Sequence, residues 1–323
     1  MGAYRRVFLG AGAFAALSAA GMAAASPTVP ARAASPDRAE PMAAHQFKAD
    51  VLCDTGELKS AIETGNTKPA ATIRLAPNCT YGYTTANGPA SALPQITGRI
   101  TLVGQTGTKI ARDPSATGQF RVADVAPGAT LEATNVSFEG GDVDGEGGGI
   151  LNNGTLYLFR SGVSDNKATG DGGGLSNGSG ATALISTSST ISGNTGVSGG
   201  GVANSGDLRI AVTRITGNTS PQDGGGGVYT SESGRTTISS SRIDNNFAEF
   251  AGGGVLNYGV TALYGVTIEN NQNSAAQGFP GGGVYNVVYN IPTPGVVTSV
   301  GSTIRANIPD NCYPPGTIRG CEP

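Results

Sequence analysis

The sequence predicts an all-β fold in which similar repeats stack on one another as the coils of a single parallel β-helix. The first observation is a glycine triplet that recurs at intervals of 25, 27, 26, 27 and 29 residues, starting at Gly147, Gly172, Gly199, Gly225, Gly252 and Gly281. The second is that an aliphatic residue follows each triplet, with asparagine two positions further on in five repeats and Thr230 in the other. The third is an aliphatic residue with asparagine three positions later, found in all six repeats. A fixed period of this length is typical of solenoids.

Each of these signatures has a physical reason in a stacked structure. A single repeat has too few aliphatic residues to form a core, so it is stable only when equivalent strands pair in parallel with the coils above and below. Stacking brings equivalent residues into columns. A glycine column suits a sharp corner where a side chain would strike the next coil, which predicts that Gly200→Val is more damaging than Ser198→Val.

Two asparagine columns are expected to form ladders of side-chain hydrogen bonds and to adopt the left-handed backbone conformation of tight corners. The first asparagine column comprises Asn152, Asn177, Asn204, Asn257 and Asn286. The second asparagine column comprises Asn166, Asn194, Asn218, Asn246, Asn271 and Asn307.

The ends of the stack need covers, since open strand edges and apolar columns promote aggregation. Within "DTGELKSAIETG", Leu58, Ala61 and Ile62 fall on one helical face behind Thr55, a residue suited to cap the helix. We therefore expect an N-terminal cap over 53–97, the parallel β-helix over 98–311 and a C-terminal cap over 312–323.

The four cysteines lie near the two ends of the folded part, Cys53 with Cys79 and Cys312 with Cys321. Three disulfide pairings are possible, and pairing within each end is the one we predict. Zinc ligation is the alternative, although the chain has no C-x-x-C spacing.

The first 33 residues are predicted to be an export signal, followed by a disordered linker over 34–52. Arg5 and Arg6 precede an apolar run rich in alanine and glycine, and "RRVFLG" resembles a twin-arginine signal. A general secretory signal is the alternative. The only histidine, His45, falls in the linker. No later segment is long and apolar enough to span a membrane. The net charge of −3 gives no basic surface for nucleic acid, and we expect a secreted or cell-surface monomer.

The two repeat signatures resemble the GGA-[ILV] and FxxN repeats of the chlamydial polymorphic outer membrane proteins over residues 140 to 307. Isoleucine or valine replaces phenylalanine here, and the chain has no C-terminal β-barrel region. With its cysteine-bracketed ends, the chain is more similar to small exported right-handed β-helix repeat proteins of bacteria. The resemblance implies a right-handed, pectin-lyase-like parallel β-helix and leaves the activity open.

Two groups of residues are candidates for function. Tyrosines gather in the later coils, and Tyr229, Tyr258, Tyr264 and Tyr285 are candidates to stack on the sugar rings of a glycan. Packing beneath a loop is the alternative account of these side chains. The preferred function is therefore a non-catalytic protein that binds a glycan or a surface protein through its sheet faces, with no cofactor.

The alternative function is a calcium-dependent polysaccharide lyase. Asp142, Asp144, Glu146 and Asp171 supply hard oxygen ligands that suit Ca²⁺, although acids beside glycine corners are also ordinary solvated turn residues. The candidate bases are arginines at or near strands of neighbouring coils, namely Arg209, Arg214, Arg235 and Arg242. No serine, cysteine or histidine arrangement for nucleophilic catalysis is present in the sequence pattern.

Overall fold

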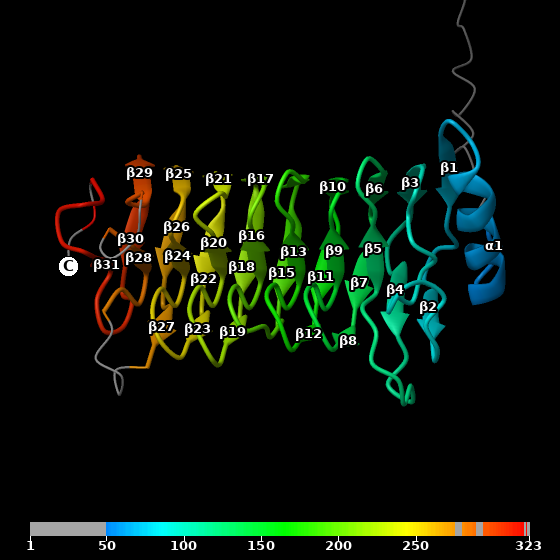
Figure 1. Ribbon diagram of the computed structural model, residues 1–323, viewed down its shortest axis with the longest axis horizontal. Coiled ribbons are helices and arrows are strands. Elements are labelled where there is room, and N and C mark those ends of the chain that lie inside the picture. Colours follow the sequence, from blue (N-terminus) through cyan, green and yellow to red (C-terminus); the bar gives the residue numbers. More distant parts are fainter. Residues whose placement is uncertain (1–49, 275–279, 289–292, 320, 322–323) are drawn as a thin grey trace, which may run out of the picture. The chain divides into compact units, whose positions relative to one another are not determined.

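A computed structural model describes residues 50–274, 280–288, 293–319 and 321, all of which belong to one compact unit. The predicted export signal and most of the predicted linker lie outside the described residues. The unit is a parallel β-solenoid of about nine coils with one helix, α1 (Thr55–Asn66), near its N-terminal end. Figure 1 shows the coils side by side, with α1 at one end of the row and the C-terminal segment at the other. The all-β solenoid predicted from the repeats is confirmed.

Three parallel sheets run the length of the solenoid. The first sheet contains β1 (Ala71–Arg74), β3 (Arg99–Val103), β6 (Thr130–Thr134), β10 (Thr155–Phe159), β14 (Thr182–Ser186), β17 (Asp207–Ala211), β21 (Arg235–Ser239), β25 (Val260–Tyr264) and β29 (Val296–Val300). The second contains β2 (Thr80–Tyr83), β4 (Lys109–Arg112), β7 (Ser137–Glu139), β11 (Gly162–Ser164), β15 (Ser189–Ser192), β18 (Thr213–Thr216), β22 (Arg242–Asp244), β26 (Thr267–Glu269) and β30 (Thr303–Arg305). The third contains β5 (Ala123–Val125), β9 (Ile150–Asn152), β13 (Leu175–Asn177), β16 (Val202–Asn204), β20 (Val228–Thr230), β24 (Val255–Asn257), β28 (Val284–Asn286) and β31 (Cys312–Tyr313).

Short strands form two further ladders at one corner. One pairs β8 (Asp142–Val143) with β12 (Lys167–Ala168), and the other joins β19 (Thr219–Ser220), β23 (Phe247–Ala248) and β27 (Gln272–Asn273). The core lies between the sheets, where the aliphatic residues that follow the glycine triplets form one buried column. Its members pair in register and are all 0% exposed, namely Ile150, Leu175, Val202, Val228, Val255 and Val284.

The glycine triplets are superimposed from coil to coil. The first glycine of every triplet has a φ between 64° and 83°, a conformation that other residues adopt only with strain. The triplets hydrogen-bond to one another, because the Gly148 N–H donates to the Gly172 carbonyl at 3.2 Å and the Gly173 N–H donates to the Gly199 carbonyl at 3.2 Å. A Cβ at Gly200 would lie 2.3 Å from the carbonyl oxygen of Thr219 in the next coil. The corner therefore has space for glycine only.

The second asparagine column forms an unbroken buried ladder. Each Nδ2 donates to the Oδ1 of the next asparagine at 2.9–3.0 Å, and the last, Asn307, donates to Asn311 at 3.1 Å. The expectation that these asparagines adopt the left-handed conformation is wrong. The residue before each one adopts it instead, namely Asp165, Gly193, Gly217, Asn245, Asn270 and Ala306. The ladder asparagine is thereby left with its side chain directed into the stack.

The first asparagine column is interrupted at Thr230, and two threonines of the first sheet complete its hydrogen bonds. Asn204 donates from Nδ2 to Thr236 Oγ1 at 2.9 Å, and the Thr230 and Thr236 hydroxyls lie 2.7 Å apart. The Thr261 hydroxyl donates to Asn257 Oδ1 at 2.8 Å. Both threonines are inward-facing residues of the first sheet, so the one irregular repeat is compensated by polar residues in the core.

The N-terminal end is covered by α1, whose Leu58 and Ile62 are fully buried. The N-cap is Asp54 and not Thr55, because Asp54 Oδ1 accepts the Glu57 N–H at 2.8 Å. The first coil is built by β1 and β2, so the sheets begin within the range 53–97 expected for the cap. Val51 is also ordered within the range expected for the linker, where it bridges Leu75 and is 4% exposed.

Both disulfides join cysteines close in sequence, as predicted. Cys53 pairs with Cys79 beside α1, and Cys312 pairs with Cys321 at the other end. Both bonds fix the ends of the folded unit against the stack. At the C-terminal end, Ile318 lies between the two cysteines and is only 2% exposed. No group of the described residues could hold the zinc ion of the alternative reading.

Candidate functional site

Three of the four predicted tyrosines lie together on the outer face of the third sheet. Tyr229 and Tyr285 are the central residues of β20 and β28, and Tyr258 follows β24 between them. The Tyr229 and Tyr258 ring centroids lie 5.8 Å apart, and the Tyr285 ring stacks on Tyr313 at 5.2 Å. The fourth, Tyr264, ends β25 in the first sheet and is 45% exposed, so it belongs to a different surface.

A cavity of about 210 Å³, here called the tyrosine cavity, lies beside these rings. Its lining is apolar and aromatic apart from one carboxylate, that of Asp223, and is formed by Asp223, Phe250, Ala251, Leu256, Tyr258, Tyr285 and Val287. The hydroxyls of Tyr229 and Tyr258 make no hydrogen bond to any other described residue. The site therefore combines ring faces, hydroxyl groups and a single anionic acceptor.

The tyrosine cavity has a negative electrostatic environment. Burial raises the pKa of the Asp223 carboxyl, and the negative charge of Asp171 raises this pKa further. The Ser198 hydroxyl donates to Asp223 at 2.8 Å and lowers it in part. Burial also raises the pKa of the Tyr229 hydroxyl, and the neighbouring carboxylates raise it further. The lining residues include no arginine or lysine. An anionic ligand is therefore disfavoured here, while neutral and cationic ones are not.

Replacing Asp223 by asparagine is expected to stabilise the protein at neutral pH. A raised pKa means that the folded state holds the Asp223 proton more tightly than the unfolded state, so wild-type stability falls as pH rises from about 4 through the raised value. Asparagine keeps an acceptor for Ser198 without the charge. In thermal unfolding from pH 3 to pH 8, the melting temperature of the Asp223→Asn variant should exceed that of the wild type at pH 7. The difference should disappear near about pH 4. A gap independent of pH would contradict this account.

The four acids predicted as calcium ligands do not converge. No group of three or more histidine, cysteine, aspartate or glutamate residues able to hold a metal forms within the part of the chain that the structure describes. Each acid instead accepts a hydrogen bond from a different neighbour: Asp142 from Gln119 at 3.5 Å, Asp144 from Thr169 at 2.7 Å, Glu146 from Ser176 at 3.0 Å and Asp171 from the Ser198 N–H at 3.0 Å. These contacts agree with the alternative reading of the acids as turn residues.

The four candidate arginine bases are divided between two sheets. Arg209 and Arg235 lie on the first sheet, in β17 and β21, whereas Arg214 and Arg242 lie on the second. Arg214 binds the buried Asp244 through two hydrogen bonds of 3.0 and 2.6 Å. These bonds raise the pKa of the Arg214 guanidinium, which makes it a weaker candidate for a general base.

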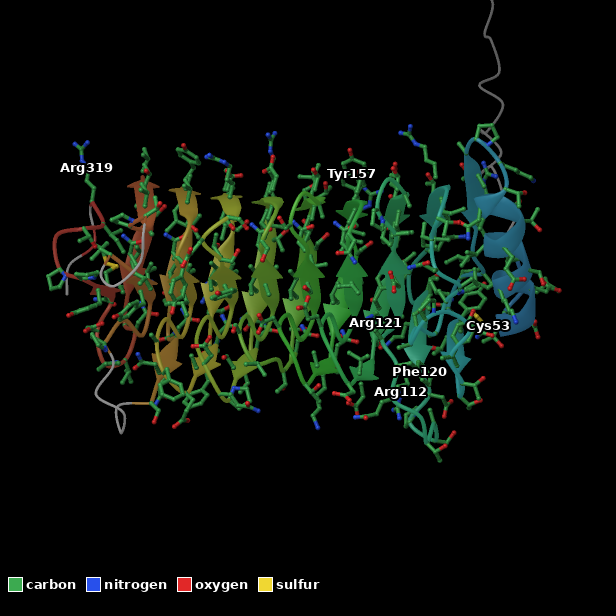
Figure 2. The ribbon with its side chains drawn as sticks, in the orientation of Figure 1. Cys53, Arg112, Phe120, Arg121, Tyr157 and Arg319 are labelled. Atoms are coloured by element: carbon green, nitrogen blue, oxygen red, sulfur yellow. A yellow bond between two sulfur atoms is a disulfide. The ribbon has the colours of Figure 1, made fainter. Side chains whose placement is uncertain are left out.

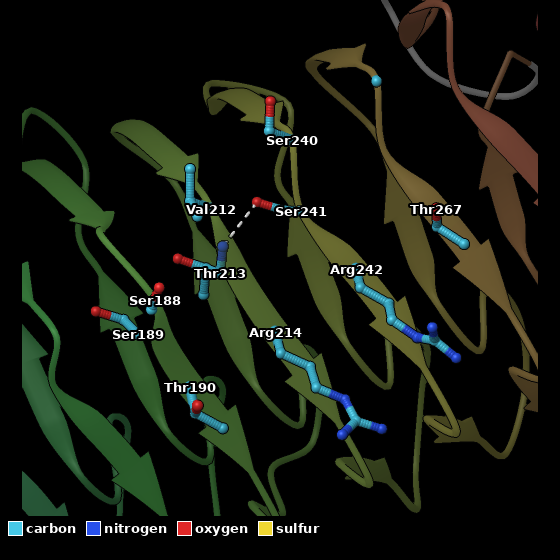
Figure 3. Close-up of a pocket in the computed structure, with 11 residues that line it drawn as sticks. Ser188, Ser189, Thr190, Val212, Thr213, Arg214, Ser240, Ser241, Arg242 and Thr267 are labelled. Carbon is cyan, nitrogen blue, oxygen red and sulfur yellow. Dashed lines mark hydrogen bonds between the residues drawn. The ribbon is translucent and has the colours of Figure 1, made fainter.

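Arg214 and Arg242 border an open hollow of about 480 Å³ at the turn between the first and second sheets. Figure 3 shows both guanidinium groups directed along the second sheet, away from the serine and threonine hydroxyls. Those hydroxyls bind the turn itself: Ser189 donates to the Ser186 carbonyl at 2.7 Å, Thr213 to Ala211 at 2.9 Å and Ser241 to Ser239 at 2.7 Å. This polar column stabilises the turn, so the tyrosine cavity is the stronger candidate site.

Comparisons of the chain with protein-family models, with curated proteins and with solved structures give no match. The fold is thus established by the structure alone, and the resemblance to the chlamydial repeats stays a prediction.

Sequence reasoning missed part of the tyrosine cavity. Leu256 and Phe250 line it, yet both look like ordinary core residues in the sequence. In the sequence, Asp223 is simply an acid that precedes a run of glycines. The repeat pattern does not reveal its contact with Tyr258, because the register that pairs Tyr229 with Leu256 aligns Ser231 with Tyr258 and leaves Asp223 beside Phe250.

Proposed function

We propose that the protein is an exported, non-catalytic scaffold that binds a neutral or amino-sugar glycan in the tyrosine cavity. The observation that carries the proposal is the meeting of tyrosines from successive coils around a cavity with a single carboxylate. Tyrosine combines an apolar ring face with a polar tip, which matches the C–H face and the hydroxyls of a sugar. Asp223 supplies the acceptor for a sugar hydroxyl or an ammonium group.

The charge around the cavity selects the class of glycan. Asp171, Asp223 and Glu232 all act on the Tyr229 hydroxyl. A uronate polymer would bring further negative charge to this surface, whereas a neutral or amino sugar would not. The proposal therefore differs in substrate class from a lyase acting on uronate polymers.

Export is proposed on the N-terminal signal pattern and is compatible with the two disulfides, which persist in oxidising compartments. Among the described residues, no helix has the length and apolar character to cross a membrane. Secretion or attachment at the cell surface would place the third sheet where glycans are found.

Tyr258→Ala is expected to weaken glycan binding about 2- to 12-fold, since one aromatic stacking contact contributes about 0.5–1.5 kcal/mol. A glycan array identifies the ligand, and calorimetry or surface plasmon resonance then gives the dissociation constants of the variants. Tyr264→Ala is the matched control, because it removes an exposed tyrosine from the first sheet and should leave affinity unchanged.

Two results would contradict the proposal. Equal affinities of the Tyr258→Ala and Tyr264→Ala variants would move the binding site elsewhere. Unsaturated products from a panel of uronate polymers, lost on addition of a chelator and in Asp144→Ala, would show that the protein is a calcium-dependent lyase.

A further inference from the structure

The two ends of the first sheet are protected to different degrees. At the N-terminal end, β1 carries Arg74, which pairs with Asp50 at 3.3 Å, and α1 packs beside the strand. At the C-terminal end the sheet stops at β29, which pairs with β25 on one side only. The opposite edge of β29 makes no backbone hydrogen bond to any described residue. Its outward N–H and C=O groups are therefore unpaired among the residues that the structure describes.

Within β29 itself, the edge lacks the features that usually prevent strand pairing, although Pro294 lies two residues before the strand. Proteins protect such edges with charged side chains, proline, bulges or covering loops. No charged residue occurs from Thr293 to Ile304, and β29 itself has the sequence Val-Val-Thr-Ser-Val. A hollow of about 340 Å³ lies between residues 299–302 and Arg319, and Figure 2 shows Arg319 beyond the end of the strand row. The C-terminal segment thus lies across a hollow from the end of β29, and its described residues form no backbone hydrogen bond with the strand.

The outer face at this end carries exposed apolar side chains in two neighbouring strands. Val296 and Val300 are 50% and 56% exposed, and their partners in β25, Val260 and Tyr264, are 38% and 45% exposed. These four are most of the large hydrophobic residues that are exposed in the described chain. Their concentration at one sheet edge indicates an interaction surface.

In place of the monomer expected from the sequence, we propose that the β29 edge pairs antiparallel with the same edge of a second copy of this chain. The outer-face residues of β29 read Val296, Thr298, Val300, an order that is the same in both directions. A two-fold axis at Thr298 therefore places Val296 opposite Val300 of the second copy, and the apolar rows of both copies join. Such self-complementarity favours a second copy over an unrelated strand, because a two-fold interface uses one surface twice. No charge on β29 opposes this contact.

The pairing pattern within the sheet fixes the geometry at the axis. Val296 and Val300 take part in hydrogen bonds towards β25, at the Gly259 carbonyl and the Gly265 N–H. In a parallel pair, alternate residues turn their backbone groups to the same side, so Val297 and Ser299 turn theirs outward. In the dimer, Thr298 of one copy then lies opposite Thr298 of the other. The two form a non-hydrogen-bonded pair with Cα atoms about 4.5 Å apart.

Light scattering and sedimentation over a concentration series test the dimer. The expected result is twice the monomer mass for the wild-type protein, and at least about 10-fold weaker self-association for Thr298→Lys, which places two like charges at the axis. The control is Thr237→Lys, because Thr237 occupies the same outward column two strands inside the sheet. A wild-type protein that is monomeric throughout, or a dimer that Thr298→Lys does not weaken, would overturn the proposal.

Cysteine substitution tests the register directly. Thr298→Cys should form a disulfide between two copies under mild oxidation, since a separation of about 4.5 Å between Cα atoms suits a disulfide. Thr237→Cys should not, and non-reducing electrophoresis distinguishes the two. A dimer in which Thr298→Cys fails to cross-link would refute the two-fold axis at Thr298. The glycan affinity of Thr298→Lys is expected to be unchanged, so this proposal can fail or succeed independently of the proposed function.

Discussion

Gly200→Ala is expected to destabilise the solenoid by about 3 kcal/mol or more, a large part of the about 5–15 kcal/mol that stabilises a typical folded protein. A Cβ at this position lies 2.3 Å from the Thr219 carbonyl oxygen, 2.5 Å from the Thr219 carbonyl carbon and 2.7 Å from the Gly226 carbonyl oxygen. All three are backbone atoms, so no rotamer change can relieve the overlap. Two hydrogen-bonded coils would have to separate, and the smallest side chain is sufficient to cause this.

Thermal unfolding followed by circular dichroism, together with limited proteolysis, measures this effect. Gly118→Ala is the matched control, because a Cβ there meets only a Phe120 ring carbon at 3.9 Å and should change stability by less than about 1 kcal/mol. Ser198→Val, the comparison that the sequence suggested, is unsuitable as a neutral control. Ser198 is 5% exposed and donates to Asp223. Equal melting temperatures for Gly200→Ala and Gly118→Ala would contradict the close approach of the corners.

The stacking of the repeats could be predicted from the sequence because a column constrains every coil in the same way. One triplet must recur in every coil when the Gly173 N–H has to meet the Gly199 carbonyl, even though the intervals vary from 25 to 29 residues. The detail within a corner follows no such rule. Asp165, Asn245 and Ala306 share the left-handed conformation with two glycines, and no residue type marks the position. The sequence therefore predicts the left-handed conformation one residue too late, at the asparagine, because the asparagine is the residue that recurs.

The candidate site could be predicted only in part, because side-chain position depends on which sheet a residue belongs to. Tyr258 and Tyr264 are six residues apart, yet the turn between them sends one to the third sheet and the other to the end of β25. The four acids predicted as calcium ligands form no group of metal-binding residues in the described chain, for a different reason. Short carboxylates in turns bind the nearest donor, as Asp144 binds Thr169, and sequence spacing does not reveal those local partners.

Asn218→Ala is expected to destabilise the protein by roughly 2–6 kcal/mol, since it leaves two buried backbone groups unsatisfied at about 1–3 kcal/mol each. Asn218 Oδ1 accepts the Asn194 N–H at 3.0 Å, and Asn218 Nδ2 donates to the Ile191 carbonyl at 3.1 Å. Asn218 is 0% exposed, so water cannot replace these bonds without opening the coil. Asn153→Ala, which removes an exposed asparagine, is the control for the loss of an amide side chain.

Double-mutant cycles distinguish a ladder from a set of independent hydrogen bonds. Asn194 Nδ2 donates to Asn218 Oδ1 at 2.9 Å, so alanine at both positions should cost less than the sum of the single changes, by about 0.5–3 kcal/mol. Asn271 is three coils from Asn194, or about 14 Å at the spacing of paired strands, and beyond about 10 Å stability changes usually add. Full additivity for Asn194 with Asn218 would show that the side chains act separately. Coupling only between neighbouring asparagines would instead show that each coil is stabilised partly by the coils beside it. This dependence is expected if one repeat cannot fold alone.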